Sequence, residues 1–346
     1  MPAESIRLAV MIAGIGGASL GTELMKCLNL AGRYEIFGCD VSKTAYGLYD
    51  AGFRKTFLAT RNNYVDSVVR ACREVDARWL LPGGEQPMVL LGAAQDRLNS
   101  EGIRLVGNDS DLVARFSDKA AAFELLATLG VAVPRTMLVR SGSCFESAVG
   151  LPCIVKPATG TGGSTMVFFA TSEAEANSYA EHITRAGGIP IAQEYVQPDE
   201  GEFTIGILST PNGDIAGSVA LRRSLDAKLS VMSRDRGGIV SSGYSQGFIG
   251  DFPEIRKQAE MIAQAIGSRG PINVQGRIRD GRLLPFEINP RLSASAYLRA
   301  LAGFNEADLL LQHLAFGTPM LAGPLRTGWY LRSLTERHVS DAELLP

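Results

Sequence analysis

The feature that most constrains the fold is a regular alternation of short apolar strands and helices along the first part of the chain. The apolar run Leu8–Ala13 ends at glycines, Ser19–Ala31 carries leucines at helical spacing, and Tyr34–Asp40 is again apolar. The same alternation continues through four further expected elements: helix Tyr64–Glu74, strand Ala77–Leu81, helix Met88–Asn99 and strand Ile103–Val106. Strands that alternate with helices predict a parallel sheet with helices on both faces.

The pattern changes after a helix expected over Asp118–Leu129, for which Ser117 is the predicted N-cap. Strands now cluster and form hairpins beside fewer helices, which is typical of an α+β unit. The expected strands are Thr136–Val139, Cys153–Lys156, Thr165–Phe169, Ile191–Tyr195, the hairpin Phe203–Ser209 with Asp214–Leu221, and the hairpin Asn273–Arg279 with Leu283–Ile288; the expected helices are Ser172–Arg185 and Pro253–Ile266. The fold class is therefore α/β followed by α+β.

Composition excludes several function classes. A net charge of −2 over 346 residues provides no basic face for nucleic acid. The five cysteines include no C-x-x-C pair, so neither a disulfide framework nor a structural zinc site is indicated. No apolar stretch reaches the ~18 residues that would span a membrane. We expect a cytoplasmic protein that binds neither nucleic acid nor membrane.

A glycine-rich loop follows the strand that ends at Lys156. Its glycines Gly160, Gly162 and Gly163, together with Ser164, can fold backbone N–H groups around phosphate oxygens, and Lys156 supplies a cation. It is not a Walker A loop, because no Lys-Ser/Thr pair follows the last glycine. The alternative is a flexible hairpin without a ligand.

The segment Phe286–Arg291 predicts a cation site. Glu287 and Asn289 lie two residues apart in a strand and so share a face, and hairpin pairing would bring Gln275 close to Glu287. Oxygen donors without histidine or thiolate suit Mg²⁺. Arg291 lies just beyond, where it could bind a transferring phosphoryl group. The alternative is an exposed hairpin with ordinary polar residues.

Two weaker signals have ordinary structural alternatives. Residues Glu194 to Val196 could offer backbone groups to an adenine edge and Glu202 a carboxylate to a ribose, although carboxylates after strands are usually solvated. Gly14-Ile-Gly16-Gly17 with Asp40 partly matches a dinucleotide fingerprint, but Ser19 stands where a glycine is expected, and a tight turn explains the glycines equally well.

Two local motifs remain. Gly83-Gly84-Glu85 follows a strand, which is where ligands bind in open α/β sheets, and a ligand site and a plain turn have equal weight there. Gly243-Tyr-Ser-Gln-Gly247 fits a nucleophile elbow, yet it lacks the strand and helix that such a motif needs.

Taken together, the glycine loop, Glu194, Gln275 and Glu287-Ile-Asn-Pro-Arg291 occur in an order that resembles the ATP-grasp superfamily. The stretch from Asn273 to Gly317 is similar to one ATP-grasp half of the carbamoyl-phosphate synthase large subunit, and the resemblance covers about residues 1–320. It implies a Rossmann-like pre-ATP-grasp domain over 1–110, a lid subdomain with the glycine flap over 111–198, a C-terminal subdomain with the metal site over 199–325, and a tail over 326–346.

The resemblance also implies roles for individual residues. ATP would contact Lys119, Lys156, Gly160, Gly162, Gly163, Ser164, Glu194, Tyr195, Val196 and Glu202. Gln275, Glu287 and Asn289 would hold two Mg²⁺ ions, with Mn²⁺ as a substitute. The catalytic residues would be Arg291, Lys156 and Arg223, and the substrate residues Glu85, Arg222, Arg223 and Ser293.

The implied activity is ATP-dependent joining of a small-molecule carboxylate to an amine through an acyl phosphate. The substrates would be amino acids or a small metabolite. The chain could form a homodimer. Two alternatives remain open at this point. One is an NAD(P)-dependent oxidoreductase that uses the Gly14 to Asp40 region. The other is a noncatalytic ATP-binding module.

Overall fold

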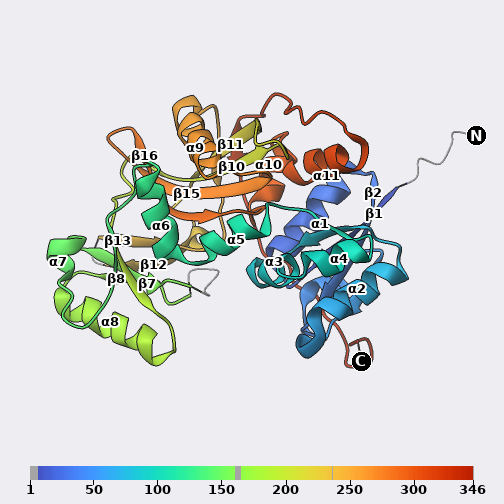
Figure 1. The fold of residues 1–346 in the computed structure, drawn as a ribbon, viewed down its shortest axis with the longest axis horizontal. Coiled ribbons are helices and arrows are strands. Elements are labelled where there is room, and N and C mark those ends of the chain that lie inside the picture. The colour runs from blue at the N-terminus through green and yellow to red at the C-terminus, as the bar shows by residue number, and fades with distance from the viewer. Residues whose placement is uncertain (1–6, 160–164, 236, 346) are drawn as a thin grey trace, which may run out of the picture.

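The computed structural model describes residues 7–159, 165–235 and 237–345. They form three main sheets and one short hairpin, arranged as three groups of elements along the long axis (Figure 1). Within these residues, no helix combines the length and the apolar character needed to cross a membrane.

The first sheet is parallel and has the strand order β3-β2-β1-β4-β5. Its strands are β1 (Leu8–Ala13), β2 (Tyr34–Asp40), β3 (Lys55–Leu58), β4 (Trp79–Pro82) and β5 (Arg104–Leu105), and its helices are α1 (Leu20–Ala31), α2 (Tyr64–Glu74), α3 (Glu85–Gly92) and α4 (Gln95–Ser100). The bounds predicted for β1, β2 and α2 are confirmed. The single helix predicted over Met88–Asn99 is wrong, because α3 ends at Gly92 and a new helix starts at Gln95.

Two helices connect this sheet to the rest of the chain: α5 (Ser110–Ser117) and α6 (Lys119–Thr128). The predicted Ser117 N-cap is wrong, because the carboxylate of Asp118 accepts from the N–H groups of Ala120 and Ala121 and so caps α6 itself. Ser117 ends α5 instead, a helix that the sequence pattern did not reveal, and its hydroxyl donates to the Val113 carbonyl.

The second sheet is antiparallel, with the order β6-β9-β7-β8, and lies with α7 and α8 at the left of Figure 1. Its elements are β6 (Thr136–Leu138), α7 (Phe145–Ala148), β7 (Cys153–Pro157), β8 (Phe168–Ala170), α8 (Glu173–Arg185) and β9 (Pro190–Glu194). The strand predicted over Thr165–Phe169 starts later than expected, because Met166 has a φ of +55° and residues 165–166 form a turn.

The third sheet has six strands in the order β16-β15-β10-β11-β14-β17. Its elements are β10 (Glu202–Ser209), β11 (Ile215–Arg223), β14 (Gly247–Ile249), α9 (Pro253–Ala265), β15 (Pro271–Arg279), β16 (Arg282–Asn289), α10 (Ala296–Leu301), α11 (Glu306–Phe316) and β17 (Gly328–Tyr330). A separate hairpin pairs β12 (Val231–Asp235) with β13 (Gly238–Ser241). Gly243–Gly247 leads into the short strand β14 and not into a helix, which excludes a nucleophile elbow.

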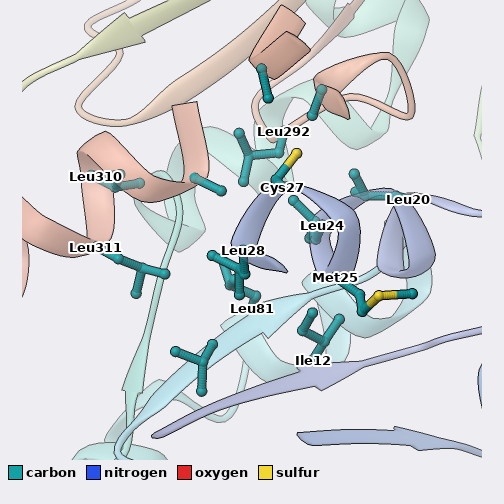
Figure 2. Close-up of a cluster of buried hydrophobic side chains, with 14 of the residues drawn as sticks. Ile12, Leu20, Leu24, Met25, Cys27, Leu28, Leu81, Leu292, Leu310 and Leu311 are labelled. Atoms are coloured by element: carbon teal, nitrogen blue, oxygen red, sulfur yellow. The ribbon is translucent and has the colours of Figure 1, made fainter. Parts of the chain in front are cut away.

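One apolar core joins the first sheet to the C-terminal elements. Ile12, Leu24 and Leu81 pack in the same cluster as Leu292 and Leu310, and Figure 2 shows these side chains facing one another. A shared core of this kind fixes the first sheet against the strand end that carries Asn289.

Gly83 provides a stability test of how closely β1 and β4 approach. A Cβ at this position would lie 2.0 Å from the Gly14 carbonyl oxygen, so Gly83→Ala should lower the free energy of unfolding by about 1–3 kcal/mol. At Gly84 the nearest heavy atom would be 3.6 Å away and the backbone is extended. Gly84→Ala should therefore change stability by less than about 0.5 kcal/mol. Urea unfolding of both variants measures this, and equal losses would contradict the contact.

Candidate active site

The strongest polar cluster lies on paired strands β15 and β16. Gln275 is the cross-strand partner of Glu287, and its Nε2 donates to Glu287 Oε2 over 3.2 Å. Asn289 Nδ2 donates to Glu287 Oε1, also over 3.2 Å. The hairpin thus brings Gln275 close to Glu287, as the sequence predicted, and both amides face one carboxylate.

The donor set has the chemistry of a weak, shared cation site. No group of three or more His, Cys, Asp or Glu side chains that could hold a metal occurs in the described chain. One carboxylate and two amide oxygens hold a hard cation poorly on their own, but Mg²⁺ is commonly bound by one or two carboxylates together with substrate phosphates. Gln275, Glu287 and Asn289 therefore have the residue types for a Mg²⁺ ion that arrives with a polyphosphate, but both amides now donate to Glu287 and would have to turn to present their oxygens.

Lys156 lies beside this cluster at the end of β7. Its Nζ donates to Gln193 Oε1 over 2.8 Å and to the Phe286 carbonyl over 2.9 Å. Burial lowers the pKa of Lys156 to about 7, an effect that the charge of Glu287 opposes and that of Lys119 reinforces. A buried amine with such a pKa is ready to take up a proton when an anion binds next to it.

A largely apolar pocket, called the slot below, lies between the second sheet, the β12–β13 hairpin and the third sheet. Its apolar walls come from Ile154, Val167, Tyr195, Val196, Ile239, Val240 and Phe286, and its polar lining includes Lys119, Lys156, Glu194, Gln275 and Glu287. The backbone N–H of Ile239 donates to the Tyr195 hydroxyl over 2.7 Å, which fastens the hairpin over the slot. The slot and the Glu287 cluster are parts of one cleft.

Arginines form hydrogen bonds and ion pairs with the Glu194 carboxylate and the Val196 carbonyl near the slot. The Glu194 carboxylate accepts from Arg279 NH1 over 2.6 Å and pairs with Arg135 over 3.3 Å. The Val196 carbonyl accepts from Arg277 NH1 over 2.6 Å, and the Arg277 guanidinium lies 4.8 Å from the centre of the Tyr195 ring. Sequence reasoning missed Arg277, whose signal was a charged residue between Gly276 and Ile278 inside a predicted strand.

Glu202 lies deeper than predicted. Its carboxylate is buried and pairs with Arg277 Nε over 2.8 Å and with Arg223 over 3.4 Å. Among the described residues that line the slot, Glu202 is absent. The structure therefore places this carboxylate under the slot, bound to two cations.

Arg222 and Arg223 do not form one basic cluster. Adjacent strand residues point to opposite faces, so Arg223 is buried and Arg222 exposed. Arg223 NH2 donates to the carbonyls of Ser230, Ser242 and Tyr244 at 3.1, 2.8 and 3.4 Å. Arg223 thereby ties the segment around the β12–β13 hairpin to β11.

Arg291 and Glu85 approach the cluster from its other side. Arg291 NH2 donates to Asn289 Oδ1 over 3.3 Å, and its Nε is buried with no hydrogen-bond partner in the described residues. Glu85, at the start of α3, lines a small cavity together with Lys119, Glu287 and Asn289. Ser293 is buried, and its hydroxyl accepts from the Ser295 N–H over 3.1 Å. The predicted phosphate-loop residues Gly160, Gly162, Gly163 and Ser164 lie outside the described residues.

The C-terminal segment contributes Arg332, which the sequence did not single out. β17 pairs with β14, and Arg332 then pairs with Glu23 of α1 over 3.0 Å and donates to the Ala294 carbonyl. Arg332 thus holds together the first sheet, the third sheet and the loop after Asn289.

Comparison with known proteins agrees with this architecture. A family model described as an ATP-grasp domain matches residues 116–295, which is more than half of the chain. The carbamoyl phosphate synthase large chain of Neisseria meningitidis is 23% identical over 214 residues, which cover 61% of this chain and 19% of that protein. The chain therefore spans about a fifth of the curated relatives that it matches.

Solved structures share the fold over nearly the whole chain. An L-amino acid ligase from Bacillus licheniformis superposes with a TM-score of 0.64 at 15% identity and covers 92% of this chain and 75% of its own. An N5-carboxyaminoimidazole synthetase from Staphylococcus aureus, complexed with ADP, gives a TM-score of 0.66 at 15% identity and covers 94% and 81%. The chain belongs to the ATP-grasp family, whose members bind ATP through this domain.

Lys156 gives a pH test of nucleotide binding. The lysine is largely neutral above its pKa of about 7 in the free protein, and phosphate oxygens placed beside it would raise that pKa. Binding of Mg-ATP at pH 8 should therefore take up close to one proton, and the affinity should fall as the pH rises above 7. Calorimetry in two buffers of different ionisation enthalpy measures the uptake, and Lys156→Met should abolish it. Unchanged uptake in that variant would contradict the assignment.

Proposed function

We propose that the chain is an ATP-dependent carboxylate–amine ligase that forms an amide or peptide bond through an acyl phosphate, on amino acids or another small metabolite. The observation that carries this proposal is that one cleft holds the apolar slot, the buried Lys156 and the Glu287 cluster. A structural neighbour described as an L-amino acid ligase supports the same reaction class.

In this proposal the slot holds the adenine and the lysines bind the phosphates. Glu194, Tyr195 and Val196 would contact the ring, while Lys119 and Lys156 would neutralise the polyphosphate with the loop residues Gly160, Gly162, Gly163 and Ser164. Glu202 would reach a ribose only after releasing Arg277 and Arg223. Gln275, Glu287 and Asn289 would hold the Mg²⁺, which would offset the negative charge of the phosphates.

The residues of the chain would act mainly by position and charge. Lys156 and Arg291 would attract the γ-phosphoryl group, and the substrate carboxylate oxygen would attack its phosphorus as the bond to ADP breaks. The amine would then attack the acyl carbon, releasing phosphate and one proton. Glu85, Arg223 and Ser293 are the proposed substrate-side residues, whereas the exposed Arg222 could act only at the rim. No protein nucleophile is required.

We also propose that the parallel sheet is the Rossmann-like domain that precedes the ATP-grasp domain, over residues 1–110, with the lid over 111–198 and the metal-bearing subdomain over 199–325. Its order β3-β2-β1-β4-β5 and its core shared with α10 and α11 support that role.

Release of ADP from Mg-ATP against a panel of carboxylates paired with amines tests the reaction. We expect release that depends on both an acid and an amine. Binding of Mg-ATP without release in any combination would favour a noncatalytic module, and binding of NADH in place of ATP would favour the oxidoreductase alternative.

A further inference from the structure

A second cavity lies wholly within the first sheet and its loops, outside the cleft just described. It has a volume of about 400 Å³ and is lined by Gly14, Gly16, Ser19, Asp40, Val41, Arg61, Tyr64, Gly83, Gly84, Gln86, Pro87 and Leu90. These residues lie at or after the carboxyl ends of β1, β2, β3 and β4. In the order β3-β2-β1-β4-β5 the connections reverse direction between β1 and β4, and this is where open α/β sheets bind ligands.

Two glycines in the wall of the cavity, Gly16 and Gly84, are not required by packing, unlike Gly14 and Gly83. Gly14 and Gly83 are required by the close approach of their backbones, since a Cβ on Gly83 would meet the Gly14 carbonyl. A Cβ on Gly16, however, would have Asp40 Oδ2 at 4.0 Å as its nearest described neighbour, and one on Gly84 would have Pro87 at 3.6 Å. Glycines that packing does not require allow a ligand to approach the backbone closely.

The electrostatics of the cavity favour an anion. The helices α1, α2 and α3 begin at Leu20, Tyr64 and Glu85, so three positive helix ends face this edge of the sheet. Arg61 is exposed at the rim, and its side chain has no ionic or hydrogen-bond partner within residues 7–159, 165–235 and 237–345. A guanidinium beside glycines that let a ligand approach the backbone is suited to a phosphate.

The same cavity offers partners for hydroxyl groups. Asp40 accepts from the N–H groups of Ile15 and Ser42 at 2.8 and 3.0 Å, which orients its carboxylate and leaves acceptor sites unused. The Tyr64 hydroxyl is buried with no hydrogen-bond partner in the described part of the chain. Val41, Pro87 and Leu90 supply an apolar wall.

We propose that this cavity binds a small phosphate monoester that carries hydroxyl groups, with its phosphate at Gly16, Gly84 and Arg61 and its hydroxyls at Asp40. The inference does not depend on the proposed ligase reaction, because none of the residues assigned to ATP, metal or catalysis lines the cavity. It also gives a role to the Gly14 to Asp40 motif that the ATP cleft does not use.

Calorimetric titration with ribose 5-phosphate tests the proposal, with ribose and inorganic phosphate as the two partial probes. We expect ribose 5-phosphate to bind more tightly than either part. Arg61→Gln should weaken this binding at least about ten-fold, and Gly16→Ala should also weaken it. The matched control is Arg78→Gln, which removes an exposed arginine just before β4 and should leave binding unchanged. Arg78 lies at the amino-terminal ends of the strands, opposite the carboxyl ends that line the cavity.

Three results would overturn the proposal: no binding of ribose 5-phosphate by the wild-type protein, equal binding by Arg61→Gln and Arg78→Gln, or binding of inorganic phosphate as tight as that of the ester. Titration of the same variants with Mg-ATP is an independent readout. Retained Mg-ATP binding in Arg61→Gln, together with weakened ribose 5-phosphate binding, assigns the loss to this cavity and not to the ATP cleft.

Discussion

Replacement of Glu287 by glutamine is expected to lower ATP turnover by about 1,000-fold while the protein stays folded. Glu287 supplies the carboxylate to which Gln275 and Asn289 both donate. Glutamine keeps the volume and one acceptor oxygen but removes the negative charge on which a divalent cation depends. Substrate-dependent ADP release measures turnover, and urea unfolding measures stability.

The control for Glu287→Gln is Glu124→Gln, which removes the same charge from an exposed position on α6. This variant should turn over ATP at the wild-type rate. If Glu287→Gln kept a rate near that of the wild type, the cation site would have to lie elsewhere. If its unfolding free energy fell by several kcal/mol, the loss of activity would say nothing about the cation.

The largest stability effect is expected at the buried ion pair between Arg299 and Glu306. Both side chains are almost fully buried, 3.2 Å apart, and Arg299 also donates to Asn273 and Thr204. Arg299→Met leaves the Glu306 charge without its cation and should cost about 3–5 kcal/mol of unfolding free energy. The double variant Arg299→Met/Glu306→Leu should recover much of this loss, because it removes both buried charges.

The pH dependence of the Arg299→Met variant follows from the sign of the Glu306 shift. Burial raises the pKa of Glu306, and Arg299 opposes that rise. Without Arg299 the folded protein binds a proton on Glu306 more readily than the unfolded chain, so the stability loss should shrink as the pH falls. Urea titrations at two pH values measure this. Arg185→Met, which breaks the exposed pair with Glu181, serves as control and should change stability by less than about 0.5 kcal/mol. An equally small loss in Arg299→Met would contradict the prediction.

Local sequence patterns predicted the elements whose periodicity is complete within a few residues. Leu8–Ala13, Tyr34–Asp40 and Tyr64–Glu74 have the predicted bounds, and the pairing of Gln275 with Glu287 follows from alternation across a hairpin. The helix expected over Met88–Asn99 was wrong because its apolar spacing continues past the break at residues 93–94.

Tertiary contacts decided what the sequence could not show. Nothing local indicates that Glu202 binds two arginines from other strands, or that alternation along β11 buries Arg223 and exposes Arg222. The tail gave no signal at all, because β17 is only three residues long and is stabilised by its pairing with β14. The candidate site was thus predicted as a set of residues, whereas the ion pairs that hold them were not.

The contact of Arg332 with Glu23 joins residues 309 positions apart in the sequence. On the ribosome, α1 is completed long before Arg332 is synthesised, so the nascent first sheet lacks the Arg332–Glu23 ion pair until then, and Glu23 has only its local pair with Lys26. Closing so long a loop carries a large entropic cost, which is repaid only after the third sheet has formed. The segment after β17 therefore holds α1 only late in synthesis, and we expect full protease resistance of the first sheet to appear only when translation has passed Arg332.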